Sequence, residues 1–388
     1  MSEAPSSGED KLLERLVMSR RVLVAVGAGG VGKTTVAAAL SVAAALRGRR
    51  VLCLTIDPAR RLGEALGLEV VRSEGQAVDL DRFMGGSRST TGSLTAMMLD
   101  TKRTFDALVL KYSSSPDQAR RLLDNKIYRY VSTSLAGTQE YMAMEKLVEL
   151  QQGSAFDLIV LDTPPTANAL DFLDAPERLI EALDSSTIRM FLQAWESTGK
   201  FSLNLLARSA AMVVRGLGRI TGGGFLEAMA QFLVELNDLF GGFKQRARAV
   251  RAALRSPEVS FVLVTSPAPM SIREVLFFSE RLEEAAMPRG VFVVNRVRRP
   301  PLSGDGGPSR DDAEQAAAAR GLRLEDGGAE RLVRAHVEAA RLAALDESHM
   351  QDLRGQAVPL VRLPELSSDV RDFAGLRDIA ELLMRGGV

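Results

Sequence analysis

The sequence of 388 residues has a single cysteine, no net charge and no long apolar run. The one cysteine, Cys53, excludes a disulfide within the chain and a zinc site built from several thiolates. Lys and Arg together number 49, as do Asp and Glu, so the overall charge favours neither nucleic acid nor an anionic membrane as a partner. Arg208 and Arg215 interrupt the most hydrophobic region, and no run reaches the roughly 20 residues of a membrane-spanning helix.

The first residues, MSEAPSSGEDKLLERLV, are polar and of mixed charge and lack the apolar core of a signal peptide. We therefore expect a cytoplasmic protein with no transmembrane segment. Hydrophobic residues make up 46% of the chain and charged residues 25%, which is typical of a globular protein with a large core. Cys53 lies inside the apolar run VLCLTI, and we predict that it is a buried small hydrophobic residue.

Six apolar runs have the length of strands, and most are apolar on both faces, as in a parallel sheet covered by helices. They are residues 21–26, 49–58, 156–165, 259–267, 289–297 and 357–364. The first run leads through glycines into the alanine-rich KTTVAAALSVAAALRG, which predicts strand, turn and helix. The fold class that follows is α/β, with a mostly parallel sheet flanked by helices.

Two long stretches between these strands have helical periodicity, and in the first of them residues 94–112 and 138–151 are the clearest helices. We expect one domain: a core of residues 20–83, 156–185 and 257–388 that contains the strands, with helical insertions of residues 84–155 and 186–256. Several methionines of the insertions lie on or near apolar helix faces, and such faces adapt to varied hydrophobic clients. Plain helical core is the favoured interpretation; a client groove stays as the alternative. These methionines are Met97, Met98, Met142, Met144, Met190, Met212 and Met229.

The stretch GAGGVGKTT matches the phosphate-binding pattern G-x-x-x-x-G-K-[ST] and lies between a strand and a helix, as its mechanism requires. The glycines let backbone N–H groups wrap the phosphates of ATP. Lys33 is predicted to reach the β- and γ-phosphate oxygens, and the Thr34 hydroxyl to bind Mg²⁺. The predicted ATP-binding residues of this loop are Gly27, Gly29, Gly30, Val31, Gly32, Lys33, Thr34 and Thr35.

Two acidic residues stand at strand ends, where a magnesium–nucleotide complex would meet them. Asp162 ends LIVLD and is placed like the carboxylate that holds the Mg²⁺ shell in phosphate-loop enzymes. Asp57 closes VLCLTID and is a candidate to orient or deprotonate the attacking water. An aspartate before proline is also an ordinary turn former, so each assignment depends on the phosphate loop beside it.

Three stretches together resemble the ArsA-type ATPases, the arsenite-pump and tail-anchored-protein-targeting enzymes: GAGGVGKTT, TIDPARRLGEALG and LDTPPTANALDFLDAP. VFVVNRV and VRLPELSSDVRDFAGL extend the likeness over most of the chain. The resemblance implies a phosphate-loop fold with a helical subdomain, ATP and Mg²⁺ as cofactors, and a dimer with two ATP molecules at its interface. It also implies that Lys33 and Asp57 are catalytic, that Thr34 and Asp162 hold Mg²⁺, and that Asn295, Pro364 and Leu366 contact the adenine.

The sequence also departs from this family. Ala28 stands where the family has a lysine that reaches the phosphates of the partner subunit, and Asn168 and Ala268 replace a histidine and a glutamate of some relatives. The loss of the lysine predicts weak hydrolysis in a homodimer, or a paralogous partner that supplies it. One cysteine and one phosphate loop argue against an arsenite pump, which uses several thiolates and two fused halves.

From the sequence we therefore expect a dimeric, Mg²⁺-dependent ATPase whose nucleotide state switches a helical subdomain that binds a partner or a hydrophobic protein client. The alternative is a scaffold or regulatory subunit that binds ATP, hydrolyses little and forms a heterodimer with a lysine-bearing paralogue. Ala28 separates the two, because restoring lysine raises turnover only if a contact from the partner subunit is missing.

Overall fold

The computed structural model describes residues 11–57, 61–84, 90–134, 138–164, 245–301, 308–366 and 373–387, with Glu181, Phe232, Glu235 and Val370. The chain divides into two compact units. The sheet unit comprises Met1–Met97, Phe156–Ala167 and Pro257–Val388, and the helical unit comprises Met98–Ala155 and Asn168–Ser256. Asn168, Met190, Met212 and Met229, together with most of the second predicted insertion, lie outside the described residues.

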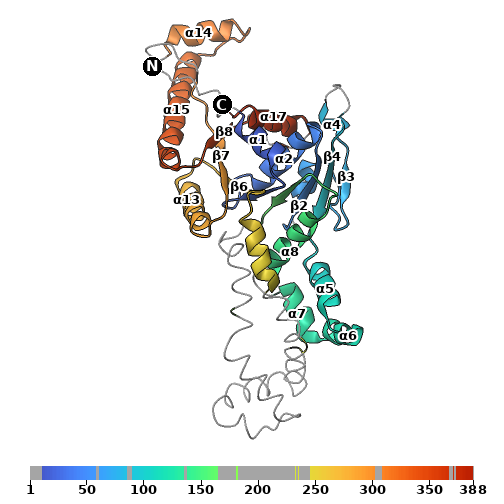
Figure 1. The fold of residues 1–388 in the computed structure, drawn as a ribbon. Coiled ribbons are helices and arrows are strands. Elements are labelled where there is room, and N and C mark those ends of the chain that lie inside the picture. The colour runs from blue at the N-terminus through green and yellow to red at the C-terminus, as the bar shows by residue number, and fades with distance from the viewer. Residues whose placement is uncertain are drawn as a thin grey trace, which may run out of the picture. The chain divides into compact units, whose positions relative to one another are not determined.

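The sheet has eight strands in the order β3-β4-β2-β5-β1-β6-β7-β8 (Figure 1). The neighbours from β2 through β5, β1, β6 and β7 to β8 pair in parallel, whereas β3 and β4 pair antiparallel at one edge. The fold is therefore α/β with a mostly parallel sheet, as predicted. The strands are β1 Val22–Val26, β2 Arg50–Thr55, β3 Gln76–Val78, β4 Ser93–Met98, β5 Leu158–Asp162, β6 Val259–Thr265, β7 Arg289–Val297 and β8 Leu360–Pro364.

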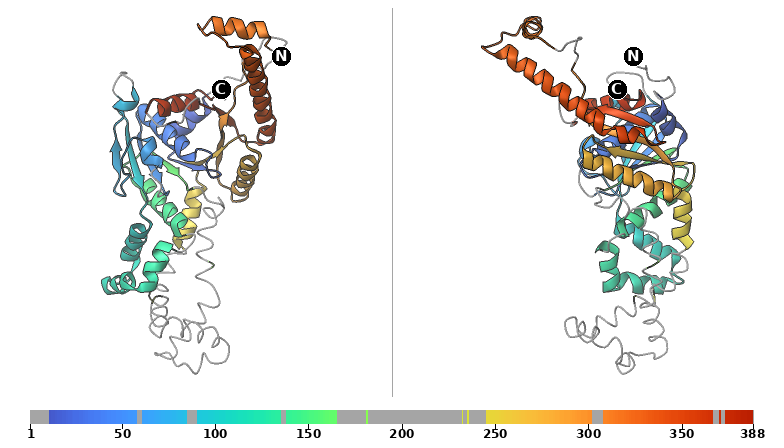
Figure 2. Two further views of the ribbon diagram at one scale, coloured as in Figure 1. Left: turned by 180° about the vertical axis from the view of Figure 1, so that it is seen from behind. Right: turned by 90° about the vertical axis from the view of Figure 1, so that its left-hand side faces the viewer.

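Helices cover the sheet within the sheet unit. One layer contains α1 (Leu12–Ser19), α2 (Lys33–Leu46) and α17 (Phe373–Met384), which pack on one another, while α13 (Pro269–Glu284) packs on β6 and β7. Figure 2 shows α14 and α15 as a pair beyond the end of β7, and α15 leads the chain back toward β8. The remaining helices of this unit are α3 Arg61–Ala65, α4 Asp81–Met84, α14 Arg310–Ala318, α15 Gly328–His349 and α16 Gln351–Arg354.

The core of this unit follows from the composition of its strands. Every residue of β1, β5 and β6 is buried, and all but Asp162, Ser260 and Thr265 are apolar, as expected for parallel strands between helices. Eleven of the fourteen residues of α2 are buried, because its alanines allow close approach on nearly all sides. This packing fixes the beginning of α2, and with it the phosphate loop.

The prediction of a helix from residue 94 is wrong over its first part. Residues 93–98 form β4, which pairs with β3, and the helix begins only at Thr101. Leu94, Ala96 and Met97 are buried, whereas Asp100 caps the following helix by accepting a hydrogen bond from the Arg103 N–H at 2.9 Å. The helical insertion therefore starts later than residue 84, since the sheet unit continues to Met97.

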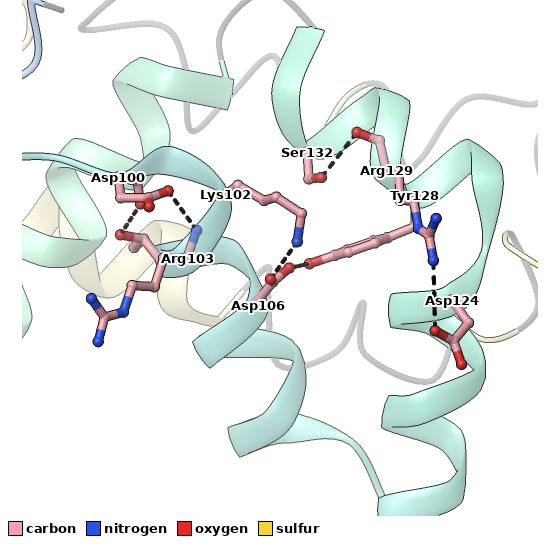
Figure 3. A network of polar contacts seen from close by, with 9 residues as sticks. Asp100, Lys102, Arg103, Asp106, Asp124, Tyr128, Arg129 and Ser132 are labelled. Carbon is pink, nitrogen blue, oxygen red and sulfur yellow. Dashed lines mark hydrogen bonds and ion pairs between the residues drawn. The ribbon is translucent and has the colours of Figure 1, made fainter. Parts of the chain in front are cut away.

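The first described helices of the helical unit are α5 (Thr101–Tyr112), α6 (Pro116–Asp124), α7 (Lys126–Ser134) and α8 (Thr138–Gln152). Figure 3 shows Lys102 of α5 and Tyr128 of α7 pointing at the carboxylate of Asp106. The Tyr128 hydroxyl donates to Asp106 at 2.6 Å, and burial raises the pKa of this phenol, which keeps it protonated as a donor. The network holds α5 against α7.

A second buried network ties α8 to the helical residues 245–254. Glu145, 1% exposed, accepts hydrogen bonds from the Arg246 guanidinium and from the Tyr141 hydroxyl, and the guanidinium also stacks over the ring of Tyr112. Met142 and Met144, on the same helix, are fully buried. The two methionines of α8 are therefore core residues and do not line an exposed groove.

Among the described helices, none combines the length and hydropathy that would let it span a membrane.

The beginnings of β2 and β5 are joined by an ion pair that makes stability depend on pH. Arg50 donates to the Asp157 carboxylate from its backbone N–H at 2.9 Å and from Nη2 at 2.6 Å, and these bonds lower the pKa of Asp157 to about 2. Folding lowers the pKa of this carboxyl, so its ionised form stabilises the folded state at every pH above the pKa of the unfolded chain. The stabilisation is lost as the pH falls through the pKa of the folded state.

We predict that Asp157→Asn lowers the free energy of unfolding by about 1 kcal/mol at pH 7. The difference from the wild type should shrink below pH 4 and vanish near pH 2, as measured by urea unfolding at several pH values. Glu284→Gln, which removes an exposed pair with Arg281, is the control and should change little at any pH. A difference that stays constant from pH 7 to pH 2 would contradict the assignment.

Candidate functional site

The loop between β1 and α2 has the conformation of a phosphate cradle. Gly27, Gly30 and Gly32 have positive φ angles of 149°, 77° and 96°, which residues with a Cβ adopt only with strain. Space is limited as well: a Cβ on Gly27 would lie 1.9 Å from the Val264 carbonyl oxygen. Gly32 precedes α2 without a side-chain cap, so the first N–H groups of the helix are directed at whatever occupies the loop.

Lys33, the first residue of α2, is 5% exposed, and its Nζ donates to the Ala28 carbonyl oxygen at 2.7 Å. Burial lowers the pKa of Lys33, while Asp162 acts in the opposite direction and the charge of Arg61 lowers the pKa further. The ammonium group is thus held inside the curve of the loop. Ala28 contributes to the loop by accepting this hydrogen bond with its backbone carbonyl oxygen.

Thr55 joins the two predicted aspartates. Its hydroxyl donates to Asp162 Oδ2 at 3.1 Å and accepts a hydrogen bond from the Asp57 N–H at 3.2 Å. Asp57 is 9% exposed and Asp162 is fully buried. The sequence offered no signal for Thr55, because its role depends on β2 and β5 being neighbours with Thr55 opposite Asp162.

Asp162 has the features of a magnesium ligand. Burial raises its pKa to about 6, although the hydroxyls of Thr34 and Thr55 and the charge of Lys33 lower the value. Its Oδ1 is buried and, within the described part of the chain, has no hydrogen-bond partner. A carboxylate oxygen left without a donor beside a threonine hydroxyl fits Mg²⁺, which prefers oxygen ligands and keeps others from water and phosphate.

The phosphate loop, Lys33, Thr34 and Asp57 line a cavity of about 900 Å³, within the range of small-molecule sites, whereas Asp162 and Thr55 are not among its lining residues. It brings together the predicted loop residues and Asp57 with residues that sequence reasoning missed, namely Arg61, Glu64, Ala65, Thr163, Arg296 and Val370. The predicted residues that line it are Gly29, Gly30, Gly32, Lys33, Thr34, Thr35 and Asp57. Gly27 and Val31 belong to the same loop without lining the cavity.

The residues predicted to contact adenine are placed differently. Asn295, in β7, donates from Nδ2 to the Val31 carbonyl oxygen at 2.9 Å and supports the phosphate loop from behind. Pro364 ends β8 and lines a separate cavity of about 410 Å³ beside α15, while the Leu366 side chain is 37% exposed. None of the three lines the cavity at the phosphate loop. Their contact with the base stays a prediction.

Residues 20–300 of the chain match the family described as anion-transporting ATPases, which is the ArsA ATPase family. The chain belongs to this family. It is 36% identical to an uncharacterized protein of Streptomyces coelicolor over 42% of this chain and 39% of the relative. Over 54% of this chain and 50% of the relative, it is 30% identical to a protein of Mycobacterium tuberculosis. These matches span half or less of the bacterial relatives' length.

A longer match is with the ATPase GET3 of Malassezia globosa, which is 23% identical over 92% of this chain and 89% of the relative. This relative, like the family, is described as an ATPase.

The glycines of the loop permit a matched test of the cradle. Gly27→Ala forces a Cβ against the Val264 carbonyl, and we expect it to cost about 3 kcal/mol of stability. Gly30→Ala meets nothing within 4 Å, so only its φ angle is strained, and we expect about 1 kcal/mol. Thermal unfolding of the two variants measures the difference. Equal losses would contradict the close approach of the loop to β6.

Cys53 is fully buried in β2, and burial raises the pKa of its thiol to about 12. We predict that a thiol-alkylating reagent at pH 8 leaves the native protein unmodified and labels one site per chain after unfolding in urea. Mass spectrometry of the intact protein gives the stoichiometry. Complete labelling of the native protein would show that β2 opens to solvent.

Proposed function

We propose that the protein is a Mg²⁺-dependent ATPase that works as a dimer, and that its nucleotide state controls the helical unit. The observation that carries the proposal is the cavity of about 900 Å³ at which the phosphate loop, Lys33, Thr34 and Asp57 meet. The loop glycines and the start of α2 suit the phosphates of a nucleotide, and the aspartate suits a water molecule beside the terminal phosphate.

In the proposed reaction, Asp57 orients the attacking water and accepts its proton. The water oxygen forms a bond to the γ-phosphorus, and the bond from that phosphorus to the β,γ-bridging oxygen breaks. The electron pair of the broken bond stays on the β-phosphate of ADP. Lys33 leaves the Ala28 carbonyl to neutralise the charge on the β- and γ-phosphate oxygens.

Thr34 and Asp162 are the proposed magnesium ligands, on the strength of the unpartnered Asp162 Oδ1. When bound, the ion neutralises phosphate charge and orients the phosphates. It also favours the ionised form of Asp162, whose burial otherwise disfavours the charge. Because the protein would provide one hydroxyl and one carboxylate, we expect the ion to bind together with the nucleotide.

The chain connectivity supports control of the helical unit. The chain crosses between the two units four times, and one crossing follows Ala167, five residues after Asp162. A shift of the residues after β5 on nucleotide binding or hydrolysis would therefore be passed directly to the helical unit. We propose that this unit binds a partner protein or a hydrophobic client, and that the protein acts in the cytoplasm.

Ala28 favours a second candidate function. If the lysine that the ArsA-type resemblance places at this position is required from a partner subunit, a homodimer of this chain lacks it. The protein would then bind ATP, hydrolyse little and act as the regulatory half of a heterodimer with a lysine-bearing paralogue.

ATP turnover per molecule, measured with Mg²⁺ over a wide range of protein concentration, tests the first candidate. We predict turnover that rises with concentration and falls about a hundredfold or more in Asp57→Asn, because the variant removes the proton acceptor. Asp79→Asn, an exposed aspartate paired with Arg82, is the matched control and should retain wild-type turnover.

The alternative predicts a flat rate near zero despite tight ATP binding, with an increase of tenfold or more in Ala28→Lys. Absence of ATP binding in the wild-type protein would reject both candidates.

A further inference from the structure

Three cations line the phosphate cavity within the described part of the chain: Lys33, Arg61 and Arg296. Lys33 is fixed by burial and by its bond to the Ala28 carbonyl. Arg296 follows Asn295 on β7 and has the strained φ angle of 62°. Arg61 is the first residue of α3 and stands four residues after Asp57. Arg61 forms an ion pair with Asp57, the predicted catalytic carboxylate.

The pair between Arg61 and Asp57 is loose. Arg61 Nη1 lies 3.9 Å from Asp57 Oδ2, at the outer limit of an ion pair, and the arginine side chain is 57% exposed while that of Asp57 is 12% exposed. The positive charge of Arg61 also lowers the pKa of Lys33, and both side chains line the same cavity. The guanidinium is therefore close to the groups proposed to bind the γ-phosphate, and it is held weakly.

We propose that Arg61 is a catalytic arginine that the chain supplies to its own site. Without a γ-phosphate it pairs with Asp57; with ATP bound it moves to the γ-phosphate and leaves Asp57 to accept the proton of the attacking water. This inference rests on the proposed ATPase function and adds the residue that recognises the third phosphate. It also gives this chain a cation in cis, where Ala28 offers none.

The exchange of partners is favourable for physical reasons. An ion pair at this distance with an exposed arginine contributes little, because water screens the arginine and its flexible side chain must be held. A guanidinium and a phosphate form two parallel charge-assisted hydrogen bonds, which are shorter and stronger. A cation at the γ-phosphate also stabilises the charge that develops in the transition state. ADP lacks this phosphate, so Arg61 would return to Asp57 after phosphate release.

The test compares Arg61→Gln with the wild type in binding and in turnover. Binding of a non-hydrolysable ATP analogue and of ADP, each with Mg²⁺, is measured by calorimetry. We expect Arg61→Gln to weaken binding of the analogue about tenfold or more and ADP less than twofold, and to lower kcat about a hundredfold or more. Arg61→Lys should recover part of both losses, since it keeps the charge but not the fork of donors.

A matched control and a double mutant separate this role from simpler ones. Arg385→Gln removes an arginine of the same unit that pairs with Glu381 at the same four-residue spacing, outside the cavity, and should change neither binding nor kcat. Arg61→Gln in an Asp57→Asn background tests whether Arg61 only shields the negative charge of Asp57. If Arg61 contacts the γ-phosphate directly, Arg61→Gln should still weaken binding of the ATP analogue more than binding of ADP in the Asp57→Asn background.

Equal weakening of the analogue and of ADP, or a selective loss that disappears in the Asp57→Asn background, would overturn the assignment of Arg61. So would a wild-type protein that binds no nucleotide. Failure of the proposed hydrolysis is distinguishable, because a wild-type protein that binds both nucleotides without turnover still reports the selectivity of Arg61. Conversely, turnover that is unchanged in Arg61→Gln rejects this inference and leaves the ATPase function standing.

Discussion

The site depends on the parallel register of three neighbouring strands, which carries their polar ends to one edge of the sheet. Thr55 of β2 and Ala25 of β1 both lie opposite Asp162 of β5. This register lets the Thr55 hydroxyl reach the Asp162 carboxylate and lets the Thr163 hydroxyl donate to the Ala25 carbonyl oxygen. A slip of one residue would turn every side chain of a strand to the other face, and these contacts would be lost.

The same edge of the sheet contains buried charged groups, which lower the stability of the folded protein when no ligand is bound. Asp162 is fully buried with one oxygen unpartnered, and Lys33 is nearly buried with its pKa lowered. The strands behind them are buried and mostly apolar, so burying either charge costs free energy. Departures of this kind from a simple apolar core are expected where a protein binds a ligand of complementary charge.

The elements predicted correctly from the sequence are those that short-range patterns of apolar residues and glycines define. The six apolar runs correspond to β1, β2, β5, β6, β7 and β8, and the spacing of the loop glycines located the cradle. β3 and β4 were missed because β3 has three residues and β4 carries Leu, Ala and Met, which are common in helices. Thr55, Arg61 and Arg296 were missed because only the three-dimensional fold brings them to the loop. The contact of Asn295 with the base stays a prediction, and the bond from its amide to Val31, 264 residues away, could not be read from the sequence.

The bond between Lys33 and the Ala28 carbonyl has a kinetic consequence. Together with the glycine conformations and the support from Asn295, it holds the loop in a curved conformation without a ligand. The conformational entropy of ordering the loop is therefore lost during folding and does not subtract from ligand affinity. A nucleotide whose phosphates bind in the loop would replace the Ala28 carbonyl as the acceptor of the Lys33 ammonium group. Association would then proceed at a rate set by encounter and charge, with no slow loop rearrangement.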